Sequence, residues 1–380
     1  MNRISKITCK AIEQNPLSAD ILSQCGKILR KFFLYFRIVT VRPMADEVNN
    51  ILVVGPSWVG DMVMAQSLFQ SLKRQHPQAN IDVIAPAWSL PVLARMPEVR
   101  RGLALAVGHG EGGLKKRWAL GRSLRGQYDW AIVLPRSLKA ALVPFFARVP
   151  VRTGFLGEMR YGLINDVRVF DKTVLDQTVK RFVALGQPRG ADVTTLELSH
   201  PSLTVDGTGA LRAMQRLELK ADKPIVGFMP GAEYGPAKQW PAQHFADLAK
   251  SVVQLGGQVW TFGSAKDRSV GEEIDQLSGG VTTNLCGETS LEEVVDLMGQ
   301  LDMAVSNDSG LMHVAAATGC YVQAIYGSSS PLFTPPLTDR REIHWLQIDC
   351  SPCFARTCQF GHYNCLKQIS PSRVLDSMSL

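Results

Sequence analysis

The 380-residue sequence lacks any apolar run long enough to predict a membrane-spanning helix. Its most apolar N-terminal segment, 29–41, is interrupted by Arg30, Lys31 and Arg37. The pattern of a secretory leader is also missing, because no clean apolar segment is followed by a small-residue cleavage site. We therefore expect a cytoplasmic protein.

Two common phosphate-binding motifs are missing as well. The loop 55–60 has the Gly-x4-Gly spacing of a P-loop, but Asp61 stands where that motif requires lysine. A carboxylate at this position would repel a triphosphate. The G-x-G-x-x-G fingerprint of dinucleotide-binding domains is absent too. P-loop NTPases and NAD-dependent enzymes are therefore disfavoured.

Acidic residues are scarce at the start of the chain. Residues 1–43 hold eight Lys or Arg and two acids, which accounts for most of the formal net charge of +7. The segment is either a basic helix that lies on an anionic membrane, or an addition that precedes the natural start at Met44. We favour the second interpretation and treat 1–43 as an extension that is not native or is disordered.

The hydrophobic pattern predicts two similar series of elements. Strands are predicted at 51–54, 81–85, 130–134, 225–229, 259–262, 304–306 and 322–326, and helices at 61–74, at about 241–255 and from about 311 onward. Strands that alternate with helices of this length are typical of parallel sheets. The predicted fold class is α/β, with two Rossmann-like parallel-sheet domains that face one cleft and bind ligands at the carboxyl ends of their strands.

Composition sets the expected domain limits. Residues 191–223 are rich in Gly, Pro, Asp, Thr and Ser, which predicts an inter-domain linker. An N-terminal domain would then span 44–190, and a C-terminal domain 224–380.

The segment 301–317 is the most informative for function. An apolar strand leads through the turn-forming residues 307–310 into a helix that starts near Leu311. Free backbone N–H groups at such a helix N-terminus bind anions, and His313 would lie beside the ligand. The alternative is a plain N-cap at Asp308 or Ser309 with a histidine in the core.

Asp61 and Lys238 are the next candidates. Asp61 is either a first-turn acid that faces the helix dipole or a general base at the mouth of a loop. Lys238 lies in a Gly/Pro loop before a helix, where a flexible ammonium can reach a phosphate; the alternative is a solvated lysine. Trp240, two residues on, is predicted to be a core residue.

Four of the eight cysteines cluster near the C-terminus: Cys350, Cys353, Cys358 and Cys365. With His362 nearby they are candidates for a structural zinc site, although the spacing is not that of a standard zinc finger. The alternative, which we favour, is a tail of free thiols that caps the C-terminal domain. Cys286 and Cys320 stand among apolar neighbours and are predicted to be buried.

Several longer motifs carry a family resemblance. They are Gly55-Pro-Ser-Trp-Val-Gly-Asp-Met62, Ala85-Pro-Ala-Trp88, Gly157-Glu-Met-Arg-Tyr-Gly-Leu-Ile-Asn-Asp166, Pro230-Gly-Ala-Glu-Tyr-Gly-Pro-Ala-Lys238, Phe262-Gly-Ser-Ala-Lys-Asp267, Ser306-Asn-Asp-Ser-Gly-Leu-Met-His313, Tyr326-Gly327 and Ser330-Pro331. Together they resemble the ADP-heptose:lipopolysaccharide heptosyltransferases of Gram-negative bacteria. The resemblance covers roughly residues 50 to 377 and leaves out 1–43.

The resemblance implies a GT-B glycosyltransferase with an N-terminal acceptor domain and a C-terminal domain that binds ADP-heptose. It implies inverting transfer of L-glycero-D-manno-heptose onto the first heptose of the inner core, which is attached through Kdo to lipid A. No cofactor or metal ion is required for this reaction, and no nucleic acid is involved. The enzyme would work in the cytoplasm, at the inner face of the inner membrane.

The resemblance also assigns roles to residues. Asp61 would be the general base, and Lys238 would offset charge on the departing ADP. Donor contacts are expected at Gly231, Glu233, Lys238, Asp308, Ser309, Gly310, Leu311 and His313. Acceptor contacts are expected at Ser57, Trp58, Gly60, Arg136, Lys139 and Arg160, the three basic residues because the acceptor is anionic.

Three alternatives remain open. The chain is the enzyme that transfers the first heptose onto Kdo, or another GT-B enzyme that uses a sugar nucleotide. The third alternative is a non-enzymatic module in which residues 1–43 and the cysteine cluster bind a membrane or a nucleic acid. The third predicts that deleting residues 1–43 abolishes function, whereas the enzyme hypothesis predicts that 44–380 stays active.

Overall fold

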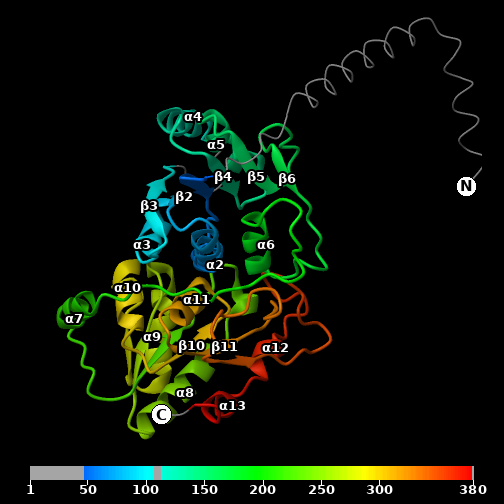
Figure 1. Ribbon diagram of the computed structural model, residues 1–380. Helices are drawn as coiled ribbons and strands as arrows, with labels where there is room; N and C mark the ends of the chain where they lie inside the picture. Colours follow the sequence, from blue (N-terminus) through cyan, green and yellow to red (C-terminus); the bar gives the residue numbers. More distant parts are fainter. Residues whose placement is uncertain (1–46, 107–112, 379–380) are drawn as a thin grey trace, which may run out of the picture.

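The computed structural model describes residues 47–106 and 113–378, and they contain two six-stranded sheets (Figure 1). The expectations for residues 1–43 lie outside the described residues. The first sheet has the order β3-β2-β1-β4-β5-β6 and the second β12-β11-β10-β7-β8-β9. All strand pairs are parallel. Both sheets therefore have the strand order of a doubly wound Rossmann-like sheet, as the sequence predicts.

The strands of the first sheet are β1 (Asn50–Val54), β2 (Asn80–Ala85), β3 (Val99–Ala104), β4 (Trp130–Val133), β5 (Val151–Phe155) and β6 (Asp166–Arg168). Those of the second are β7 (Ile225–Met229), β8 (Gln258–Thr261), β9 (Thr282–Asn284), β10 (Met303–Asn307), β11 (Tyr321–Ile325) and β12 (Arg341–His344). The strand β10 extends through Asn307, which the sequence assigns to a turn, because Asn307 pairs with Ile325 of β11.

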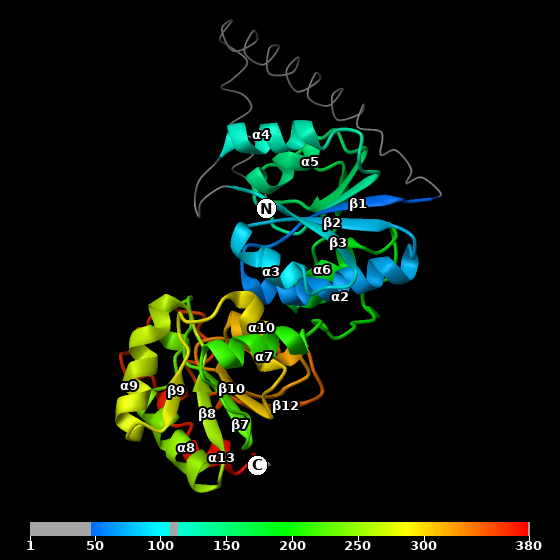
Figure 2. The same cartoon turned by 90° about the vertical axis from the view of Figure 1, so that its left-hand side faces the viewer.

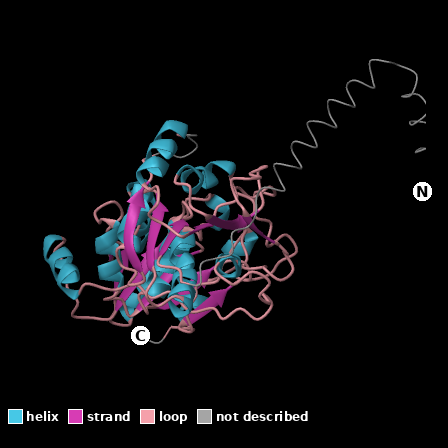
Figure 3. Cartoon of the chain, turned by 45° about the horizontal axis from the view of Figure 1, so that its top comes forward, coloured by secondary structure: helices cyan, strands magenta, loops and turns pink. Residues whose placement is uncertain are grey.

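The helices of the first half are α2 (Val59–Gln75), α3 (Leu90–Leu93), α4 (Leu114–Ser123), α5 (Leu142–Phe146) and α6 (Thr178–Leu185). Those of the second half are α7 (Gly207–Arg216), α8 (Ala242–Gln254), α9 (Arg268–Ser278), α10 (Leu291–Met298), α11 (Gly310–Ala317), α12 (Asn364–Lys367) and α13 (Pro371–Leu375). Helices flank the strands on both faces (Figure 3). None of these helices is long and apolar enough to cross a bilayer.

The alternation of side chains along β1 divides the core of the first half. Ile51 and Val53 belong to the apolar cluster beneath α2 and α6, whereas Leu52 and Val54 belong to the cluster beneath α4 and α5. Figure 2 shows these two pairs of helices on opposite faces of the sheet. Because both faces are covered, the strand is apolar throughout rather than alternately polar.

One apolar cluster joins the two halves. It runs from the α2 face of the first sheet through α11 to one face of the second sheet. Figure 1 shows α2 directly above α11, and the two helices are in contact. Burial of this shared surface fixes how the two sheets stand relative to each other.

The connecting segment lies along α2. Gln66 exchanges hydrogen bonds with the backbone of Ser202, at 2.8 and 2.9 Å, and Ser67 donates to Ser199 O at 2.6 Å. The predicted linker 191–223 contains α7, which packs on α10 of the second half. The domain limits drawn at 190 and 224 stay a prediction.

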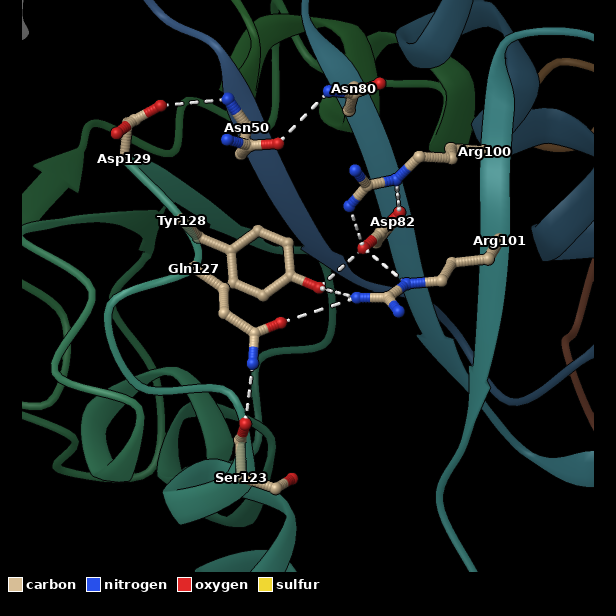
Figure 4. Close-up of polar contacts among 9 residues, drawn as sticks. All are labelled: Asn50, Asn80, Asp82, Arg100, Arg101, Ser123, Gln127, Tyr128 and Asp129. Atoms are coloured by element: carbon tan, nitrogen blue, oxygen red, sulfur yellow. Dashed lines mark hydrogen bonds and ion pairs between the residues drawn. The ribbon is translucent and has the colours of Figure 1, made fainter.

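A buried carboxylate holds β3 to its neighbours (Figure 4). Asp82 on β2 is fully buried and accepts hydrogen bonds from Arg100, at 2.8 and 2.6 Å, from Arg101 at 2.8 Å and from Tyr128 at 2.6 Å. Burial alone raises the pKa of Asp82. The bonds from Arg100, Tyr128 and Arg101 outweigh burial, so the pKa lies below its usual value.

We expect Asp82→Ala to lower the free energy of unfolding by about 2 kcal/mol, because the buried Tyr128 hydroxyl loses its acceptor and β3 loses its anchor. Both arginines are half-exposed and can turn to solvent, which limits the loss. A depressed carboxyl pKa stabilises the fold above the unfolded-state pKa, so the difference from wild type should shrink below about pH 4. Urea unfolding at several pH values tests this, and an unchanged difference at acid pH would contradict it.

Candidate active site

Four loops at the carboxyl ends of strands carry most of the predicted site residues. They follow β1, β4, β7 and β10, the two middle strands of each sheet. The chain leaves one middle strand toward one edge and the other toward the opposite edge, and ligands bind where such loops diverge. In chain order the residues are Ser57, Trp58, Gly60, Asp61; Arg136, Lys139; Gly231, Glu233, Lys238; Asp308, Ser309, Gly310, Leu311, His313.

Two helix N-termini, one from each half, meet at a pair of glycines. A Cβ on Gly60 of α2 would stand 2.7 Å from Cδ2 of His313 and 3.3 Å from the Cα of Gly310 on α11. A Cβ on Gly310 would lie 3.3 Å from the backbone N of Gly60. Glycine at both positions therefore permits a close approach that a side chain would prevent.

Neither helix has a side-chain cap. The N-cap residues Trp58 and Ser309 make no capping hydrogen bond. The simple alternative, in which the residues before Leu311 serve only as a conventional cap, therefore lacks its defining bond. Two helix N-termini with this geometry favour negative charge near their first turns.

Asp61, in the first turn of α2, has an unusual electrostatic environment. Burial raises the pKa of its carboxyl, Lys238 lowers it and Asp308 raises it, so that the pKa is about 6. Because Lys238 and Asp308 belong to the second half, the two halves complete this environment together. A carboxylate with a pKa near neutrality suits proton transfer.

Lys238 is held in place by the second half. Its Nζ lies 2.5 Å from Oδ2 of Asp308 and 5.1 Å from the centre of the Tyr234 ring. Tyr234 in turn donates a hydrogen bond to Phe354 O at 2.6 Å. Both members of the ion pair are mostly buried, which makes the position of the ammonium well defined.

His313 is buried beside this ion pair. Burial lowers the pKa of its imidazole to about 4; Asp308 raises the pKa and Lys238 lowers it. The ring is therefore neutral at physiological pH and can act as a hydrogen-bond donor without adding charge. His313 is buried, as the hypothesis of a core histidine predicts. It also lies near the N-terminus of α11, where the hypothesis of an anion-binding site places it.

Asn307 is a site residue whose role the sequence did not reveal. Its Oδ1 accepts a hydrogen bond from the backbone N–H of Trp240 at 3.0 Å, and its Nδ2 donates to Pro230 O at 2.6 Å. One side chain thus ties the end of β10 to both ends of the Lys238 loop. Trp240 itself is buried, which confirms the prediction that it is a core residue.

Two serines after β11 were also missed. The hydroxyls of Ser328 and Ser329 are buried and have no hydrogen-bond partner in the described structure. Ser328 N–H bonds to the backbone O of Ala237, next to Lys238. Unsatisfied buried hydroxyls next to a predicted anion site are candidates for ligand contacts.

The other predicted donor residues have mixed surroundings. Gly231 lies against Asp267, whose Oδ1 would be 2.3 Å from a Cβ at position 231. Glu233 is exposed and pairs with Lys266 at 2.8 Å. Leu311 packs against the shared core. Their contacts with a donor stay a prediction.

Arg160 differs from the other predicted acceptor residues. Its side chain is completely buried and donates to Phe155 O, to Pro135 O at 2.6 Å and to Ser137 O at 3.2 Å. Pro135 and Ser137 flank Arg136, so Arg160 shapes the loop from which Arg136 and Lys139 extend. In this arrangement its guanidinium is occupied by backbone carbonyls, and its direct contact with an acceptor stays a prediction.

Arg136 and the β1 loop lie at the protein surface. Arg136 is exposed, and its guanidinium stands 4.5 Å from the centre of the Phe170 ring. Trp58 is 44% exposed, and the indole N–H of Trp88 donates to Ser57 O at 3.1 Å. An exposed cation and an exposed indole on neighbouring loops are suited to a polar, anionic ligand.

The cysteine cluster contains free thiols. In residues 47–106 and 113–378, no group of three or more His, Cys, Asp or Glu is placed to hold a metal ion. Burial, followed by interaction with the other three thiols of the cluster, raises the pKa of Cys365 to about 11. The structural zinc site stays a prediction. Cys286 and Cys320 are buried, as predicted.

Comparisons with known proteins identify the family to which the chain is similar. Residues 117–364 match the family model described as glycosyltransferase family 9 (heptosyltransferase). The chain is 46% identical over 339 residues to lipopolysaccharide heptosyltransferase 2 of Escherichia coli K12, covering 87% of this chain and 97% of that protein. It is 45% identical over 344 residues to lipooligosaccharide heptosyltransferase 2 of Haemophilus influenzae, covering 87% and 98%.

A solved structure shows the same architecture. The E. coli ADP-heptose lipopolysaccharide heptosyltransferase II aligns with a TM-score of 0.77 at 45% identity, covering 86% of this chain and 96% of that chain. The alignment spans both sheets, which confirms the GT-B arrangement expected from the sequence.

We expect Gly60→Ala to lower the free energy of unfolding by about 1–3 kcal/mol, because the new methyl group overlaps the His313 ring. Adding His313→Ala should restore part of the loss. Gly207→Ala, where a Cβ meets nothing within 4 Å, is the matched control and should change stability little. Denaturant unfolding measures all three, and equal stability of Gly60→Ala and the control would contradict the close contact.

Proposed function

The chain belongs to glycosyltransferase family 9, the heptosyltransferases, and we propose that it transfers heptose from ADP-heptose onto the first heptose of the lipopolysaccharide inner core. The relatives named for the second heptosyl transfer match over nearly their whole length. Within the site, one observation carries the proposal. Burial raises the pKa of Asp61 in the first half to about 6, and Lys238 of the second half lowers it against this trend.

Asp61 acts as the general base. Its carboxylate takes the proton of the acceptor hydroxyl while that oxygen forms a bond to the anomeric carbon of the heptose. The bond from this carbon to the diphosphate oxygen breaks on the opposite face, so the configuration inverts. ADP departs with the bonding electrons, and Asp61 is left protonated. General-base assistance of this kind contributes roughly 10²–10⁴-fold to the rate.

Lys238 and the N-terminus of α11 stabilise the departing diphosphate. The ammonium is fixed by Asp308, and the first-turn amides of α11 have no side-chain cap. Negative charge develops on ADP in the transition state, where preorganised positive charge is most effective. His313 adds a neutral hydrogen-bond donor. These groups supply the required charge without a metal ion.

The first half receives the acceptor. Arg136 and Lys139 extend from the loop after β4, next to the loop after β1 that leads to Asp61. An acceptor built on phosphorylated lipid A is anionic, which suits these two cations. Because that acceptor is anchored in a bilayer, the enzyme works at the inner face of the inner membrane.

The acceptor preference tests the proposal directly. Purified protein with ADP-heptose should modify mono-heptosylated Kdo2-lipid A and leave heptose-free Kdo2-lipid A unchanged, as measured by the mass of the products. Product from the heptose-free acceptor alone would assign the chain to the first heptosyl transfer. No product from either acceptor, in protein that still binds ADP, would reject heptose transfer and retain the donor fold.

We expect Asp61→Asn to lower kcat by about 10²–10⁴-fold, since an amide cannot accept the proton. In wild type kcat/KM should rise with pH through about 6 and then level off, because only the ionised carboxyl is active. Lys238 lowers this pKa, so Lys238→Gln should slow transfer and also move the rise to higher pH.

Initial rates across the pH range measure both effects. Circular dichroism should show that the Asp61→Asn variant remains folded. Full activity of Asp61→Asn, or an unshifted rise in Lys238→Gln, would contradict the assigned base.

A further inference from the structure

The helix α4 has an unusual outward surface. It covers the face of the first sheet that is turned away from the second half (Figure 2). Its inner side packs tightly, since a Cβ on Gly121 would lie 2.5 Å from the Cβ of Phe146 on α5. Arg117, also on the inner side, donates to Lys139 O at 3.2 Å. Leu120 packs against the same core, and the other residues of the helix face solvent.

Two large apolar side chains lie on that exposed side. Leu114 is 59% exposed and Trp118 is 45% exposed. They are four residues apart, so they project from the same side of the helix, and Arg122 extends the row by another turn. The Arg122 guanidinium stands 4.8 Å from the centre of the Trp118 ring, and Lys115 is exposed beside it. We call these four residues the α4 face.

The sequence in and around α4 is strongly basic, and Lys115, Lys116, Arg122 and Arg125 are exposed. The segment 114–152 contains nine Lys or Arg and a single acid, Asp129, although the whole chain has a net charge of only +7. The Asp129 carboxylate accepts hydrogen bonds from the backbone N–H groups of Asn49 and Asn50, at 3.0 and 2.8 Å. The one acid is therefore engaged at the start of β1. Phe145 of α5 adds a further exposed aromatic ring.

We infer that the α4 face docks on an anionic lipid bilayer. A helix with Trp and Leu beside Lys and Arg matches the boundary between acyl chains and negatively charged headgroups. Long cationic side chains can reach the headgroups while the indole and the leucine enter the boundary region. The strong local excess of positive charge favours an anionic bilayer over an uncharged protein surface.

The position of α4 is consistent with the reaction, and this step rests on the proposed function. In a parallel sheet the helix after β3 starts at the carboxyl edge and runs back toward the start of β4. Leu114 and Trp118, in the first turns of α4, therefore lie toward the same edge as the loop that leads to Asp61. Docking there would bring the acceptor side of the site toward a lipid-anchored acceptor.

Vesicle binding tests the inference in the full chain. We expect wild type to co-sediment with vesicles of phosphatidylcholine and phosphatidylglycerol, to bind phosphatidylcholine alone weakly, and to be released by salt. The variant Lys115→Glu/Trp118→Ser should bind the anionic vesicles about tenfold less tightly. The matched control, Leu211→Ser/Lys220→Glu, alters an exposed leucine and lysine of the second half and should bind as wild type does.

Transfer assays separate docking from catalysis. With a deacylated, soluble acceptor the α4 variant should match wild type in kcat/KM, and with the acceptor in anionic vesicles it should lose activity in proportion to binding. Residues 1–43 are present in both proteins, so a difference between them belongs to α4. Equal vesicle binding by variant and wild type would overturn the inference. Normal vesicle binding without transfer to any acceptor would overturn the proposed function and leave the docking surface intact.

Discussion

The contact between Gly60 and Gly310 is the constraint on which the rest of the site depends. It places the first turn of α2, from one sheet, against the first turn of α11, from the other. With larger residues the helices would separate by the thickness of a side chain. Asp61 would then move away from Lys238 and Asp308, and its pKa would no longer depend on them. The chemical character of the site is therefore set by backbone packing at two residues.

This arrangement is kept in spite of its electrostatic cost. A buried Asp61 with a raised pKa opposes folding at neutral pH, and a mostly buried Lys238–Asp308 pair adds little net stability. The apolar cluster that runs through α2 and α11 provides the compensating stabilisation. The polar loops are also fixed in position, because Asn307 and Arg160 form hydrogen bonds with their backbone carbonyls and N–H groups. The core thus maintains a polar arrangement that would not assemble by itself.

Sequence reasoning recovered the parts of the fold that burial dictates. The middle strands, such as β1 and β7, are covered on both faces and appear as short apolar runs. The edge strand β3 reads Val-Arg-Arg-Gly-Leu-Ala, because only one of its neighbours is a strand and much of it meets solvent. Two consecutive arginines do not fit the pattern that predicts a strand. Their partner in the structure, Asp82, is distant in the sequence.

The site shows the same division. The loops and Asp61 follow from local patterns and from the family resemblance, but the surroundings of Arg160 do not. The sequence pattern around a basic residue is the same whether its side chain contacts a substrate or, like Arg160, donates to three backbone carbonyls. Only the folded chain distinguishes the two. Asn307 is the opposite case: the sequence suggests only a turn residue, but its side chain links the end of β10 to both ends of the Lys238 loop.

The proposed mechanism divides the roles between the halves and therefore requires both of them. In the proposed mechanism the base belongs to the half that carries Arg136 and Lys139, and the cation for the leaving group belongs to the other half. Each half alone has only one of the two charges that a displacement at the anomeric carbon requires. The first sheet consequently has two distinct faces: α2 packs against α11 of the other half through an apolar cluster, and α4 presents cations and an indole to solvent. The alternation of Ile51 and Val53 with Leu52 and Val54 in a single strand supports both faces, so the geometry of catalysis and that of surface attachment depend on the same four residues of β1.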